Sequence, residues 1–84
     1  MINKKMTIEA LKNYLFDMWE SHYFLTINGI CFDTEKVTLA YDPDFDVIEI
    51  YLINDTDLEN ALCSFSLKLI KTVNNTIIEL DMWL

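Results

Sequence analysis

Carboxylates are the side chains with the widest chemical range in this sequence, whose 84 residues include 14 Asp and Glu but only six Lys and Arg. The densest cluster, Asp42-x-Asp44-x-Asp46, resembles the first ligand positions of an EF-hand calcium loop. The similarity then ends, because Val47 stands where that loop needs Gly and Ile53 where it needs a bidentate Glu. We therefore predict no metal site. A calcium site of another kind in this turn is the minor alternative, since hard oxygen ligands are present.

Residue types that support enzymatic catalysis are sparse. His22 is the only histidine, and the adjacent Ser21 is not expected to face it on a helix, so no catalytic triad can be drawn. Gly29 is the only glycine and is needed in a turn, which excludes a glycine-rich phosphate loop. Cys31 and Cys63 are predicted to be buried free thiols, and one long-range disulfide is the alternative. Two cysteines and one histidine cannot complete a four-ligand zinc site without carboxylates. The sequence thus predicts a protein that is not an enzyme and has no cofactor.

The net charge of −8 is confined to one segment of the chain. Lysines and carboxylates balance in residues 1–32 and again in residues 60–84, whereas residues 33–59 carry nine carboxylates against Lys36 alone. The sequence contains no arginine, and contacts to nucleic-acid phosphates need clustered Lys or Arg. Direct binding to nucleic acid is therefore disfavoured, and the electrostatic complement of residues 33–59 is a basic protein.

The acidic segment has two interpretations. One is solubility, because a chain with 52% apolar residues needs charge on its surface. The other is imitation of nucleic acid, because carboxylates two residues apart on a strand project from one face about 6.6–6.8 Å apart. Phe45, between two aspartates, either folds back onto the sheet or anchors a partner. The candidate partner-binding residues are Asp42, Asp44, Phe45, Asp46, Glu49, Tyr51, Asp55, Asp57 and Glu59.

The N-terminal residues do not predict export or membrane insertion. Lys4 and Lys5 are followed by Glu9, Lys12 and Asn13 rather than by an apolar stretch. No apolar run approaches the roughly 18–20 residues that span a bilayer. We expect a cytoplasmic protein without a membrane partner.

Helical periodicity is clearest in one stretch. Residues 7–22 place apolar side chains on one stripe, and Thr7 is suited to cap the N-terminus. A capping-box pattern predicts a further helical turn at 56–61, followed by a strand. A longer helix through Leu58, Ala61, Leu62 and Phe65 is the alternative, opposed by the alternation of apolar residues from Cys63 to Leu69. The expected strands are 24–27, 30–33, 36–41, 46–53, 63–73 and 76–83.

Three turns organise these strands into hairpins. Asn28-Gly29 is typical of a type I′ turn. A turn in residues 42–46 joins the second pair. If Pro43-Asp44 is its centre, Val37 lies opposite Ile50 and Leu39 opposite Ile48. A register shifted by two residues keeps the same faces and is the alternative. Asn74-Asn75 joins the third pair and sets Leu69 opposite Leu80, Leu67 opposite Met82, Phe65 opposite Leu84 and Lys68 opposite Asp81.

These elements predict an α+β domain spanning residues 1–84, with one N-terminal helix packed on an antiparallel sheet of five or six short strands. Several apolar residues then fall on strand faces opposite the core, where a partner, a second copy or a different packing would cover them. They are Tyr51, Ile53, Ile70, Ile77 and Trp83.

The function that follows is a non-enzymatic acidic binding protein, an inhibitor of a nucleic-acid-handling protein that acts partly by nucleic-acid mimicry. In composition, though in no motif, the chain is similar to the small acidic inhibitors of phages and mobile elements. One alternative is a structural or assembly module that forms a homodimer or larger oligomer through an apolar sheet face. Another is an immunity or antitoxin-like protein that neutralises a basic toxin.

Overall fold

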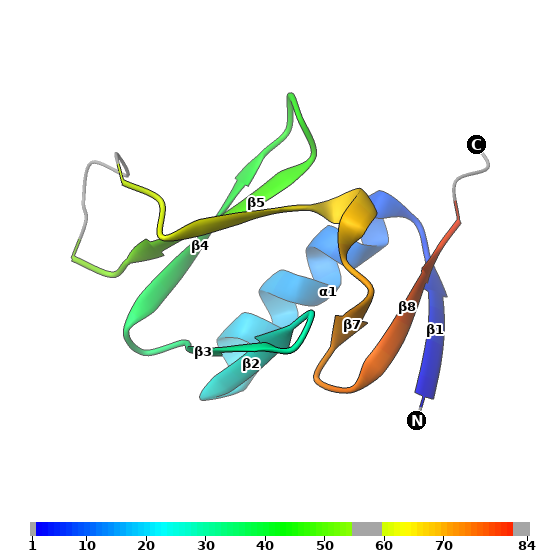
Figure 1. Cartoon of the computed structure of the whole chain (residues 1–84), viewed down its shortest axis with the longest axis horizontal. Coiled ribbons are helices and arrows are strands. Elements are labelled where there is room, and N and C mark those ends of the chain that lie inside the picture. The colour runs from blue at the N-terminus through cyan, green and yellow to red at the C-terminus, as the bar shows by residue number, and fades with distance from the viewer. Residues whose placement is uncertain (1, 55–59, 82–84) are drawn as a thin grey trace.

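The computed structural model describes residues 2–54 and 60–81, which form one helix, one 3₁₀ turn and eight strands in two sheets (Figure 1). This confirms the α+β class with more strands than the five or six expected. The elements are β1 (Ile2–Met6), α1 (Ile8–Ser21), β2 (Phe24–Ile27), β3 (Ile30–Asp33), β4 (Val37–Asp42), β5 (Val47–Leu52), β6 (Cys63–Ser66), η1 (Leu67–Leu69), β7 (Thr72–Val73) and β8 (Thr76–Leu80).

The larger sheet has the order β1-β8-β7-β2-β3 and the smaller one β4-β5-β6. The expectation of a single antiparallel sheet was wrong in two respects, because the strands form two sheets and one pair is parallel. That pair is β1 with β8, in which Ile2 lies beside Thr76 and Met6 beside Leu80. The prediction missed β1 because its short polar run has no turn signal that links it to a partner. Its pairing depends on bringing the two ends of the described chain together, which only the fold can do (Figure 1).

Helix α1 forms where its apolar stripe predicted. The hydroxyl of Thr7 accepts a hydrogen bond from the backbone N–H of Ala10 at 3.1 Å, which confirms the N-cap. At the other end His22 adopts an extended conformation and ends the helix. Leu11 and Leu15 are fully buried, and α1 contacts elements of both sheets.

The core fills the space between α1 and the two sheets. Its members are apolar side chains with at most 9% of their surface exposed, so each contributes its burial to the free energy of folding. They are Leu11, Leu15, Leu25, Ile27, Val37, Leu39, Ile48, Ile50, Leu67, Ile70, Val73 and Ile78.

The first hairpin matches its predicted register, with Leu25 opposite Phe32 and Ile27 opposite Ile30. Gly29 has a φ of 83°, as the turn requires. The second hairpin adopts the register shifted by two, in which Val37 faces Leu52 and Leu39 faces Ile50. The reason is that its turn has four residues rather than two, since the last pair of the ladder is Asp42 with Val47.

The third hairpin is correct at its turn and wrong in its length. Val73 pairs with Thr76, the predicted register, but the strand expected over 63–73 is divided. Its first part, β6, pairs with β5 and sets Phe65 opposite Ile48, and η1 then carries the chain into the other sheet. The pairs of Leu69 with Leu80 and of Lys68 with Asp81 therefore do not form in the ladder. The expected partners Met82 and Leu84 lie outside the described residues.

Two residues of the expected outer apolar surface are buried. Tyr51 is 6% exposed and Ile70 2%, so different packing explains both, whereas Ile53 is 60% exposed and Ile77 is partly buried. Trp83 lies outside the described residues. The helical turn expected at 56–61 lies mostly outside them too, and Asn60 and Ala61 have no regular secondary structure.

Candidate functional site

The tip of the β4–β5 hairpin is a turn fixed by hydrogen bonds. The backbone N–H of Asp44 donates to the carboxylate of Asp42 at 3.0 Å. The hydroxyl of Tyr41 donates to Asp46 Oδ1 at 2.8 Å, and the backbone N–H of Leu67 donates to the Asp46 carbonyl at 2.9 Å. Asp46 has a φ of 52°, a left-handed conformation that Asp and Asn tolerate better than most residues. The turn is therefore tied to β4 and to the start of η1.

Phe45 projects from this turn into solvent. It is 75% exposed, the highest value among the exposed large apolar side chains of the described residues. Of the two arrangements expected, the structure therefore has the one in which the ring is not folded onto the sheet. An exposed aromatic residue therefore lies between Asp44 and Asp46 in the chain.

The predicted acidic residues do not form a straight row along one strand. Asp42 ends β4, whereas Asp44 and Asp46 lie in the turn, so the strand spacing does not apply to them. Glu49 on β5 accepts a hydrogen bond from the hydroxyl of Tyr51 at 2.9 Å. The strand register places Asp42, Glu49 and Tyr51 on one face, but Tyr51 exposes little of its surface there. Asp55, Asp57 and Glu59 lie outside the described residues.

Little of the negative charge is neutralised by contact. Of the carboxylates between residues 33 and 54, only Asp33 has a lysine within 4 Å, at 3.9 Å from Lys36. The pKa of Tyr41 is raised above its ordinary value by its hydrogen bond to Asp46, by desolvation and by the charges of Asp46, Glu9 and Asp42. The carboxylates near the turn therefore oppose ionisation of Tyr41.

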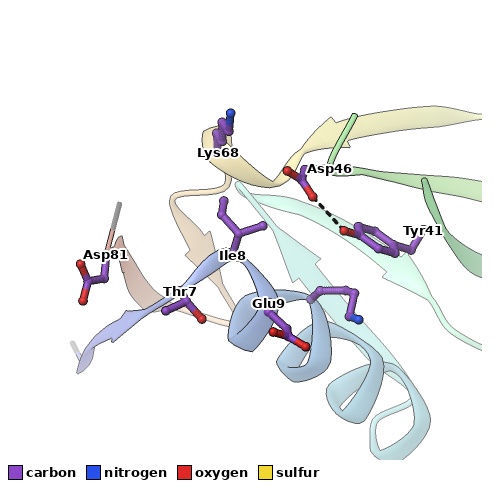
Figure 2. A pocket seen from close by; sticks show the side chains of 8 residues that line it. Thr7, Ile8, Glu9, Tyr41, Asp46, Lys68 and Asp81 are labelled. Atoms are coloured by element: carbon purple, nitrogen blue, oxygen red, sulfur yellow. Dashed lines mark hydrogen bonds between the residues drawn. The ribbon is translucent and has the colours of Figure 1, made fainter. Parts of the chain in front are cut away.

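We call residues 43–46, which connect β4 to β5, the acidic turn. A pocket of about 610 Å³ opens beside it, between the first turn of α1, β4 and η1 (Figure 2). Lys12 Nζ lies 5.1 Å from the centre of the Tyr41 ring, a distance typical of a cation–π contact. Neither residue was predicted to belong to a site. Tyr41 precedes Asp42 and the acidic turn, and this is the signal that could have identified it. The lining residues are Thr7, Ile8, Glu9, Lys12, Tyr41, Asp46, Lys68 and Asp81.

The other chemically capable side chains lie apart from the hairpin. Both cysteines are free, but the prediction that they are buried was wrong for Cys31, which is exposed on the edge strand β3. Cys63 is partly buried, and this burial raises the pKa of its thiol. His22 does face Ser21, with Nδ1 2.9 Å from its hydroxyl, because His22 has already left the helix.

Residues 2–54 and 60–81 contain no group of three His, Cys, Asp or Glu side chains arranged to hold a metal ion. In the same residues, α1 is too short and too polar to cross a membrane. No protein-family model, curated protein or solved structure matches the chain.

Proposed function

We propose that this protein is a non-enzymatic acidic binding protein whose β4–β5 hairpin docks on the basic surface of a nucleic-acid-handling protein and inhibits it. The observation that carries the proposal is Phe45, 75% exposed in a turn that is held by hydrogen bonds and flanked by carboxylates. An aromatic ring on a fixed turn loses little conformational freedom on binding and is typical of an interface anchor.

The carboxylates around Phe45 supply the attraction to the partner. Un-neutralised charges of one sign speed the encounter with a partner of opposite sign, and this effect weakens as salt is added. A basic groove that binds nucleic acid is such a partner. The docked hairpin would occupy that groove and exclude the nucleic acid, which is the sense in which the hairpin acts as a mimic.

Testing this proposal begins with identification of the partner by pull-down from a native lysate at low and moderate salt, and continues with binding kinetics. Removing four charges with Asp42→Asn, Asp44→Asn, Asp46→Asn and Glu49→Gln should lower the association rate about tenfold or more at low salt. Asn at position 46 keeps both the acceptor for Tyr41 and the tolerance of a left-handed φ, so the fold should persist. Phe45→Ala should instead raise the dissociation rate.

The matched control removes four exposed carboxylates from other parts of the surface: Asp17→Asn, Glu20→Gln, Glu35→Gln and Glu79→Gln. It has the same net charge as the test variant and should retain most of the association rate. The proposal fails if the hairpin variant binds with unchanged affinity and salt dependence, or if nucleic acid does not compete with the protein for its partner. A secreted or imported basic toxin as the captured protein would favour the immunity interpretation.

A second candidate function is assembly through exposed apolar side chains, three of which lie in or next to the β2–β3 hairpin. Tyr23 is 72% exposed, Phe24 61% and Ile30 51%. Sedimentation over a range of concentrations distinguishes the candidates. A homodimer that Phe24→Ser dissociates would support assembly, and a monomer at every concentration would exclude it.

A further inference from the structure

The pocket beside the acidic hairpin is built by elements from distant parts of the sequence. Thr7, Ile8 and Glu9 come from the start of α1, Tyr41 and Asp46 from the hairpin, and Lys68 and Asp81 from near the C-terminal end (Figure 2). Its volume of about 610 Å³ exceeds what one side chain fills. The pocket shares Asp46 with the turn that presents Phe45, so a partner docked on the hairpin would also cover the pocket.

Carboxylates reach the pocket from separate elements. Glu9 and Asp46 form no ion pair with any described residue, and both line the pocket with Ile8; Figure 2 shows Glu9 on α1 and Asp46 on the hairpin. Their charges also act together on the hydroxyl of Tyr41, whose pKa they raise. Two carboxylates without an ion pair, of which Asp46 accepts one hydrogen bond from Tyr41, lie beside an apolar side chain and an aromatic ring. This lining suits a ligand with an apolar stem and a cationic end.

The two lysines that line the pocket form no ion pair with Glu9 or Asp46. The ammonium group of Lys12 lies near the Tyr41 ring and has no carboxylate within 4 Å. Lys68 is exposed on η1 and forms no ion pair with a described residue. An arginine side chain suits this lining better than a lysine, because its planar guanidinium donates several hydrogen bonds in fixed directions and matches the geometry of a carboxylate.

We propose that this pocket receives an arginine side chain of the basic partner, as a second anchor beside Phe45. The inference rests on the proposed function, since it assumes a basic partner on the hairpin. Its ligand chemistry can nevertheless be tested on the protein alone, because a capped arginine presents the same stem and guanidinium.

The direct test is a titration of the ¹⁵N-labelled protein with N-acetyl-arginine N-methylamide, followed by amide chemical shifts. The neutral citrulline analogue has nearly the same shape without the charge and serves as the ligand control. We expect arginine to shift the amides of Ile8, Glu9 and Asp46, and citrulline to leave them in place. Glu9→Gln should weaken arginine binding about two- to fivefold, the range typical of one exposed charge pair.

Glu20→Gln is the matched protein control, because it removes the same charge from an exposed position of the same helix. It should leave the arginine affinity unchanged. Shifts of equal size with citrulline, shifts scattered over the whole acidic surface, or equal effects of the two Gln substitutions would overturn the proposal. A lysine analogue that binds more tightly than arginine would overturn the choice of side chain.

The two proposals fail in different ways. If Phe45→Ala and the hairpin charge variant weaken partner binding but Glu9→Gln does not, the hairpin is the interface and the pocket is not part of it. If capped arginine binds the pocket while the hairpin variants leave partner binding intact, the pocket is a cation site and the proposed docking surface is wrong.

Discussion

Tyr41 is the residue that connects the helix, the hairpin and the pocket. Its hydroxyl donates to Asp46 in the acidic turn, and its ring lies against the ammonium group of Lys12 from α1. Substituting it would disturb the presentation of Phe45 as well as the pocket wall. Tyr41 is therefore a positioning residue for the proposed interface, and its ionisation reports on the negative field there.

The pKa of Tyr41 provides a test of this field. Because the neutral phenol donates to Asp46 and nearby charges oppose the phenolate, the folded-state pKa lies above the unfolded value. The stabilisation is present below the unfolded pKa, near 10, and is lost as the pH rises through the folded pKa. Asp46→Asn keeps an acceptor but removes the charge, so it should lower the pKa of Tyr41 in an NMR titration. Asp44→Asn should have little effect, because Asp44 does not contribute to the shift; equal effects would contradict this account.

At the scale of elements, two asparagines join the β2–β3 hairpin to the η1–β7 segment. Asn28 Oδ1 accepts from the backbone N–H of Lys71 at 2.7 Å and of Thr72 at 3.2 Å, and its Nδ2 donates to the carbonyl of Leu69. Asn74 Oδ1 accepts from the N–H of Thr26 at 2.8 Å. Both residues have left-handed backbone conformations, so each serves its turn and links neighbouring strands.

Asn28→Gly separates these two roles, since Gly keeps the left-handed turn and removes the side-chain hydrogen bonds. We expect a loss of about 1–2 kcal/mol in the free energy of unfolding, measured by urea denaturation. Asn75→Gly is the control: Asn75 also has a positive φ, but its side chain makes no hydrogen bond with the described residues. Its effect should stay within about 0.5 kcal/mol. A loss as large as that of Asn28→Gly would mean that backbone preference, not the amide, accounts for the effect.

At the scale of the whole molecule, β1 completes the larger sheet by covering the edge of β8. The backbone N–H of Asp81 donates to the carbonyl of Met6 at 2.8 Å, which extends this contact beyond β8. Lys4 Nζ also lies 4.4 Å from the centre of the Tyr14 ring on α1. The N-terminal strand therefore ties the C-terminal part of the sheet to the helix.

Deletion of residues 2–5 should expose the edge of β8. Loss of several ladder hydrogen bonds, at about 0.5–1.5 kcal/mol each, predicts a drop of about 2–4 kcal/mol in the free energy of unfolding. Hydrogen exchange should show lost protection in Ile77 and Glu79, whose amides face β1, while Ile78, which donates to the Lys71 carbonyl on the other side, and the strands β4 and β5 stay protected. Lys4→Ala with Lys5→Ala keeps the strand backbone and should lower stability far less. Unchanged protection of β8 after the deletion would show that β1 contributes little to the sheet.

The sequence by itself determined the local elements of this protein. The stripe of Leu11 and Leu15 predicted the helix, and Asn28-Gly29 and Asn74-Asn75 predicted two turns with their registers. These signals are local, because helix periodicity and turn chemistry act between residues close in the chain. The acidic turn was found in the same way, as a dense group of carboxylates around one Pro and one Phe.

Only the tertiary structure decided which strands share a sheet and what surrounds the acidic turn. Residues 63–73 divide between the two sheets where Leu67 and Ile70 are buried in the common core, and no neighbouring residue signals this division. The pairing of β1 with β8 joins residues from opposite ends of the described chain. The contact of Lys12 with Tyr41 likewise depends on how α1 lies against the hairpin. Such contacts join residues far apart in sequence, so their gain in free energy exists only once the whole chain has folded.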